Sequence, residues 1–126
     1  MKLFYRISAY LLLIGVLHTA LTPLFYDRFS PDALWFAGTG LALVYLNLLN
    51  IVAERSREGW MLKLCVAANL AGLIYGALIV FALPEIQAFI SLFIFLAVTI
   101  GSTYALFESA QQKTRRQADE KRKAVG

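Results

Sequence analysis

Residues Trp60–Leu83 read WMLKLCVAANLAGLIYGALIVFAL, a run of 24 residues whose one charge, Lys63, lies near its start. An α-helix needs about 20 apolar residues to cross the hydrocarbon core of a bilayer. A helix also pairs its own backbone N–H and C=O groups, which no water can satisfy in lipid. This stretch therefore predicts a transmembrane helix.

Three further segments have the same character. They are residues 7–26, 33–53 and 86–107, which are 20, 21 and 22 residues long and carry no charge. The whole chain is 60% hydrophobic and only 16% charged, whereas soluble domains carry roughly 25% charged residues. We therefore predict an all-α integral membrane protein. Its fold would be an antiparallel four-transmembrane-helix bundle (residues 1–107) followed by a basic cytoplasmic tail (108–126).

The links between these segments contain helix-start and helix-end signals. Ser30-Pro31-Asp32 is typical of a helix start, with Ser30 as the cap and Pro31 at the first helical position. Residues 54–59 form a polar hinge, and Pro84-Glu85 is a very short link. The tail from Glu108 is polar on every face. It is expected to extend the fourth helix by a few turns and then fray.

The basic residues predict the orientation. Eleven of the twelve Lys and Arg residues lie at the N-terminus, around the second link or in the tail, and the remaining one is Arg28. Because cytoplasmic loops carry the excess of Lys and Arg, this bias predicts that both termini are cytoplasmic (N-in/C-in). Residues 1–20 also have features of a signal peptide, but His18 is a poor residue three positions before a cleavage site.

The sequence disfavours several functions. The single cysteine, Cys65, excludes an intrachain disulfide and a redox pair. No Asp or Glu lies well inside a segment, which disfavours a proton-coupled exporter. There is no GxSxG, HExxH or phosphate-binding loop, and a lone histidine makes a poor metal or haem site. We expect no cofactor, no metal and no nucleic-acid partner. Enzymatic activity is less expected than a non-enzymatic role.

Polar residues inside the segments are the candidate site, since such residues are costly in lipid. His18 shares a helical face with Gly15, Thr19 and Thr22, and its role is either to fix helix packing, to contact a ligand or to bind a metal or haem. A second polar stripe lies along one face of the second segment, and it would form either a helix–helix contact or the wall of a polar pocket. Its residues are Thr39, Leu43, Asn47, Asn50 and Glu54. The predicted ligand-binding residues are His18, Thr22, Asn47, Asn50, Asn69 and Tyr75.

Gly72 and Gly76 form a GxxxG motif on the face that also carries Cys65 and Asn69. Such small-residue surfaces let two helix backbones approach closely, either within one chain or in a homodimer.

The runs Gly15-Val16-Leu17-His18-Thr19 and Trp35-Phe36-Ala37-Gly38 resemble segments of the DUF6463-like group of small bacterial four-helix membrane proteins. The resemblance covers mainly residues 10–50. It implies a bacterial inner membrane and no particular activity.

Three hypotheses follow. The first is a non-enzymatic inner-membrane protein that binds a lipid-like small molecule or a membrane partner in a polar-lined cavity. The second is a homo-oligomeric transporter or channel subunit, and the third is a lipid- or isoprenoid-modifying enzyme that uses His18. Membrane lipids are expected partners in each. For the basic tail, the alternatives are a solvated topology anchor and a contact with anionic lipids or a cytosolic partner.

Overall fold

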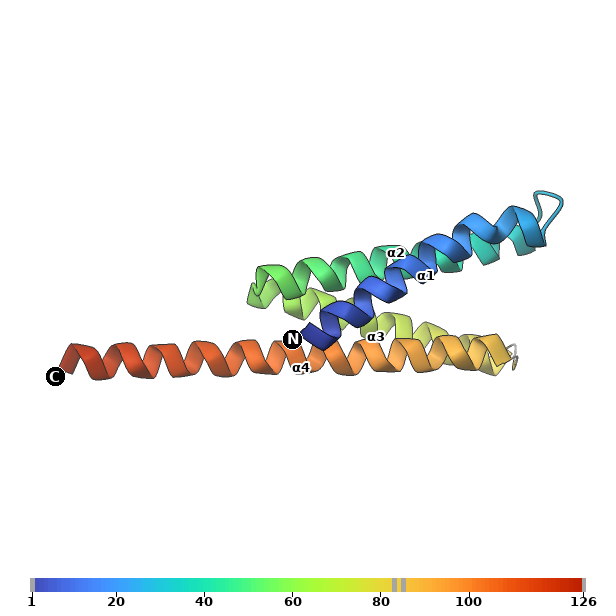
Figure 1. The fold of residues 1–126 in the computed structure, drawn as a ribbon. Coiled ribbons are helices and arrows are strands. Elements are labelled where there is room, and N and C mark those ends of the chain that lie inside the picture. The colour runs from blue at the N-terminus through green and yellow to red at the C-terminus, as the bar shows by residue number, and fades with distance from the viewer. Residues whose placement is uncertain (1, 83, 85, 126) are drawn as a thin grey trace. The chain divides into compact units, whose positions relative to one another are not determined.

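The computed structural model describes residues 2–82, 84 and 86–125, and this part of the chain consists of four α-helices without a strand (Figure 1). The helices are α1 (Lys2–Phe25), α2 (Pro31–Ser56), α3 (Gly59–Ala82) and α4 (Ile86–Val125). The predicted segment end Leu83, the link residue Glu85 and the last tail residue Gly126 lie outside the described residues. The chain divides into two compact units, Met1–Arg55 and Ser56–Gly126.

All four helices are long and apolar enough to cross a membrane, as the sequence predicts. No more than 22% of the most apolar window of any of them is buried inside the protein. Large apolar side chains along each helix are exposed, including Leu24, Trp35, Ile74 and Phe93. A chain with this much uncovered apolar surface is a multi-pass membrane protein, because hydrocarbon can cover what the protein itself leaves exposed.

The largest departure from the predicted boundaries concerns the tail. α4 continues without a break through Phe107 and Glu108 to Val125 and is 40 residues long. The expectation that the tail frays after a few turns is therefore wrong for the described residues. Gln, Lys, Arg, Glu and Ala dominate this stretch, and all are good helix formers. At 1.5 Å per residue, α4 is about 60 Å long, twice the thickness of the hydrocarbon core.

The first turn of α2 has the predicted cap. The backbone N–H of Ala33 donates to Ser30 Oγ at 3.2 Å, and that of Leu34 donates to the Ser30 carbonyl at 3.0 Å. Pro31 occupies the first helical position, where its missing N–H costs nothing. Ser30 therefore satisfies backbone donors that the start of a helix leaves without a partner.

Two glycines let α1 and α2 approach closely. A Cβ atom built on Gly40 would collide with Thr19 Oγ1 and would lie 2.8 Å from the Thr19 backbone nitrogen and 2.9 Å from the Gly15 carbonyl oxygen. A Cβ on Gly15 would likewise lie 2.8 Å from the Gly40 carbonyl oxygen. The two backbones are thus in contact, and any side chain at position 40 would push them apart.

In the second unit, Gly76 of α3 receives the ring of Phe95 from α4. A Cβ on Gly76 would lie 3.0 Å from Phe95 Cδ2 and 3.6 Å from the Cα atom of Leu92. About one helical turn from Phe95, Thr99 Oγ1 lies 2.7 Å from the Phe95 carbonyl oxygen of its own helix and 3.1 Å from the Asn69 carbonyl oxygen of α3, so its one hydrogen is shared between the two acceptors. Gly76 therefore forms its close contact within one chain, on the small-residue face that the sequence singles out.

Arg57 joins α2 to α3 in a backbone conformation that L-residues seldom adopt, with φ of 57°. Its carbonyl accepts a hydrogen bond from Ser109 Oγ at 3.5 Å, and its guanidinium lies 3.7 Å from the Glu108 carboxylate. These two contacts tie the start of the second unit to the point where α4 leaves its apolar segment.

The glycine contact gives a first prediction. Gly40→Ala should lower the free energy of unfolding by about 1–3 kcal/mol, because the methyl group meets backbone atoms that have nowhere to move. Gly38 is the matched control, since a Cβ there meets nothing within 4 Å. Gly38→Ala should be neutral or stabilise the helix by up to about 1 kcal/mol. Unfolding titrations with a denaturing detergent would measure both. Equal stability of the two variants would contradict the close contact.

Candidate functional site

The face of α1 that carries His18 lies against an aromatic cluster. The imidazole of His18 stacks on the ring of Phe36 from α2, with centroids 3.8 Å apart and planes inclined by 20°. Phe25 and Tyr26 also contact Phe36, each with a centroid separation of 5.6 Å. Sequence reasoning named His18 but missed Phe36 as its neighbour. We call His18, Phe25, Tyr26 and Phe36 the aromatic cluster.

The hydrogen bonding of His18 is incomplete. Its Nε2 atom is buried and has no hydrogen-bond partner among the residues that the structure describes, although the side chain as a whole is half-buried. A buried polar atom without a partner costs about 1–3 kcal/mol. The stack on Phe36 holds the ring in place but satisfies neither nitrogen. Among the described residues of the first unit, this atom is therefore a buried polar group that the protein does not satisfy.

Two threonines beside His18 bond to backbone carbonyls. Thr22 Oγ1 lies 3.5 Å from the His18 carbonyl oxygen. Thr19 Oγ1 lies 3.0 Å from the Gly15 carbonyl and 3.4 Å from that of Ala37 in α2, so one hydroxyl hydrogen serves both acceptors. Pro23 follows and lacks the N–H that would bond the Thr19 carbonyl. This part of α1 is therefore rich in polar backbone groups next to the aromatic cluster.

The asparagines of α2 are fully buried and bonded. Asn47 Nδ2 donates to the Leu43 carbonyl at 2.8 Å, and Asn50 Nδ2 lies 3.5 Å from Asn47 Oδ1. Glu54, at the end of the same stripe, is also buried. Phe36 and Asn47 are separated by eleven residues of α2, about 16 Å of helix rise. The described contacts therefore do not bring Asn47 to His18.

Asn69 and Tyr75 belong to the second unit. Asn69 is fully buried and its Nδ2 lies 3.5 Å from Cys65 Sγ, while its carbonyl accepts the bond from Thr99. Tyr75 is half exposed on α3. A single cavity shared by Asn69, Tyr75 and the polar residues of the first unit stays a prediction.

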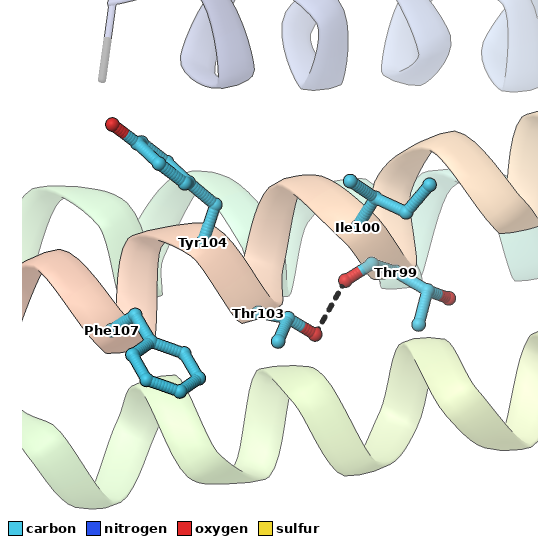
Figure 2. A pocket seen from close by; sticks show the side chains of 5 residues that line it. All are labelled: Thr99, Ile100, Thr103, Tyr104 and Phe107. Atoms are coloured by element: carbon cyan, nitrogen blue, oxygen red, sulfur yellow. Dashed lines mark hydrogen bonds between the residues drawn. The ribbon is translucent and has the colours of Figure 1, made fainter.

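Figure 2 shows a surface depression on α4 that contains none of the predicted site residues. Its lining consists of Thr99, Ile100, Thr103, Tyr104 and Phe107. All five come from one helix, Tyr104 and Phe107 point away from each other, and the Thr103 hydroxyl donates to the Thr99 carbonyl at 2.8 Å. The depression is open and apolar, so it resembles a lipid-facing furrow more than a binding pocket.

The structure also identifies residues that sequence reasoning missed. Ser8 on α1 is fully buried, and its Oγ has no partner among the described residues. Gly40 makes the closest helix contact of the first unit. The signal for Gly40 was present in the pair Gly38–Gly40, but only the observed register shows which of the two glycines faces α1.

No protein family, curated protein or solved structure matches the chain. The resemblance to the DUF6463-like group therefore stays a prediction, and the function has to be argued from the chain's own residues.

A contrast between two variants tests the difference between His18 and Asn47. His18→Phe keeps a ring on Phe36 and removes both nitrogens, so it should leave the free energy of unfolding unchanged or raise it by about 1 kcal/mol. Asn47→Leu removes the acceptor that the buried Asn50 uses within α2 and should cost about 1 kcal/mol, the net size of one intramolecular hydrogen bond. Unfolding in detergent would measure both. A large destabilisation by His18→Phe would mean that an imidazole nitrogen forms a structural hydrogen bond within the protein that fixes the helix packing.

Proposed function

We propose that the chain is a non-enzymatic protein of a bacterial inner membrane that binds a lipid-like small molecule beside His18. Its four helices would form an antiparallel bundle with both termini in the cytoplasm. A membrane-protein partner in place of the small molecule is the nearest alternative.

The buried Nε2 atom of His18 is the observation that carries this proposal. Placing an imidazole in hydrocarbon costs free energy, so histidines inside transmembrane segments usually pair with another polar group. Thr22 shares its face, Phe36 stacks on the imidazole, and Tyr26 contacts Phe36. A molecule with one polar group and an apolar body fits this combination, because the polar group can bond to the imidazole while the aromatic rings contact the rest.

The depth of the site supports a lipid-like ligand. His18 lies seven residues before Phe25, about 10 Å along α1 from the end of that helix. A water-soluble molecule would have to leave its hydration shell to reach this level. An amphipathic molecule that already resides in the bilayer would not.

The other two functions gain less support. The oligomer hypothesis used the Gly72–Gly76 face, and Gly76 already receives Phe95 of its own chain. The enzyme hypothesis needs a second group to work with His18, and in the described residues its near neighbour is the Phe36 ring. No group of three or more His, Cys, Asp or Glu residues gathers as metal ligands within residues 2–82, 84 and 86–125.

Ligand retention tests the proposal directly. The wild-type protein, extracted in a mild detergent, should retain an apolar molecule in native mass spectrometry, and His18→Phe should lose at least about nine-tenths of it, as expected for one lost hydrogen bond of about 1.4 kcal/mol. Thr39→Val is the control, because the Thr39 hydroxyl bonds only to the Trp35 carbonyl of its own helix in the described contacts.

A wild-type protein that retains nothing, or equal retention by both variants, would refute the ligand site. Loss of a copurified protein, rather than of a small molecule, from His18→Phe would favour the membrane-partner alternative.

The orientation has its own test. Single cysteines would be introduced at Phe29, which is exposed between α1 and α2, and at Lys113, after replacing the buried Cys65 with Ala. A membrane-impermeant maleimide applied to intact spheroplasts should label Phe29→Cys and should label Lys113→Cys only after the cells are opened. The reverse pattern would place both termini outside.

A further inference from the structure

The basic residues that follow the apolar part of α4 form two clusters at different heights. Lys113, Arg115 and Arg116 make up the near cluster, and Lys121, Arg122 and Lys123 make up the far cluster. All six side chains are exposed. Because α4 is unbroken to Val125, helix rise fixes the spacing between the two clusters.

The level of the membrane boundary follows from the residues around Glu108. Phe107 ends the apolar run of α4, and Trp60 begins that of α3; both are exposed aromatic residues of the kind that lie at a lipid–water interface. Two contacts join the link between α2 and α3 to α4 at this level. They are the Arg57–Glu108 ion pair and the hydrogen bond from Ser109 to the Arg57 carbonyl. Arg57 therefore marks the same boundary on the neighbouring link.

Distances along α4 separate the two clusters. Lys113 and Arg116 lie about 7 and 12 Å beyond Glu108, while Lys121 lies about 20 Å beyond it. The headgroup layer is about 5–8 Å thick, and the field of anionic lipids decays over a Debye length of about 8 Å. The near cluster thus stands in the headgroup layer or just above it, and the far cluster stands beyond the reach of the lipid charge.

Acidic residues lie close to both clusters. Glu108 is paired with Arg57 and so does not offset the near cluster. Asp119 and Glu120 directly precede the far cluster and also lie four residues after Arg115 and Arg116, respectively, on the same helix, so they offset positive charge in both clusters, and only the distance from the bilayer separates the two. Lys63, exposed in the first turns of α3, adds a further positive charge near the boundary.

We propose that the near cluster, together with Lys63, binds the phosphate groups of anionic phospholipids, and that the far cluster does not. The rigid helix makes α4 a stalk that holds its last turns away from the bilayer. This proposal rests on the membrane insertion of α4 but not on the direction of insertion or on the His18 site.

The fluorescence of Trp60 provides the test. The chain has two tryptophans, so Trp35→Phe leaves Trp60, at the start of the apolar run of α3, as the single emitter. The full-length protein would be reconstituted in vesicles of phosphatidylcholine with 30 mole per cent phosphatidylglycerol, an amount on the order of the anionic lipid in bacterial membranes. Either lipid would be brominated in turn, because bromine quenches nearby tryptophan. Since both leaflets carry the same lipids, the result is independent of orientation.

The two clusters serve as matched variants. K113Q/R115Q/R116Q should lower the preference of Trp60 for phosphatidylglycerol over phosphatidylcholine by about fivefold or more, and K121Q/R122Q/K123Q should leave it unchanged within about twofold. High salt should remove most of the preference of the wild type. Equal effects of the two triple variants, or no preference in the wild type, would overturn the proposal.

A nucleic-acid partner is the competing outcome. Binding of a labelled single-stranded RNA to the protein in pure phosphatidylcholine vesicles, lost in K113Q/R115Q/R116Q, would assign the near cluster to RNA and overturn the proposal. Absence of such binding, together with the lipid preference, would support it.

Discussion

Hydrocarbon offers no hydrogen-bond partner to a peptide group, and this constraint shapes every helix of the chain. Each segment satisfies its own backbone, so helix–helix contacts add specificity rather than the main stability. Such contacts depend on close van der Waals packing and on a few polar bonds. In the first unit, Gly15 and Gly40 allow the close packing of α1 and α2. In the second unit, Thr99 of α4 forms a polar bond to the Asn69 carbonyl of α3. A glycine on a helix face therefore stabilises the packing here, because it lets the neighbouring helix backbone approach closely.

The fold class was predictable because its signals are long and redundant. Length and hydropathy identified four segments, and Ser30 identified the start of α2. Of the predicted polar stripe, Leu43, Asn47, Asn50 and Glu54 are buried, while Thr39 at its start is only partly buried. The end of α4 was not predicted, because hydropathy stops at Phe107 while helix formation does not. The polar residues beyond it favour a helix as strongly as the apolar residues before it, because helix propensity does not depend on hydropathy.

The site was predictable only in part. Sequence spacing places Thr22 and His18 on one face, but it cannot tell which residue of α2 lies opposite them. That depends on the register between α1 and α2, which the contact of Gly40 with Thr19 sets to within a fraction of a helical turn. This register places Phe36 opposite His18, and Asn47 then lies about three helical turns of α2 away from Phe36. A one-turn shift would give a different neighbour, and nothing in the residue pattern alone excludes it.

The length of α4 has a mechanical consequence. A helix that continues unbroken from the hydrocarbon to Val125 couples its outer end to the tilt of its membrane segment. Transmembrane helices tilt by about 20° on average, over a range of about 40°. Because the part beyond Glu108 is about 25 Å long, a change in tilt of about 10° swings its tip sideways by about 4 Å. A small change in bilayer thickness that alters the tilt would thus displace the water-exposed end of α4 by several ångströms. The rotation would be centred near the Arg57–Glu108 ion pair.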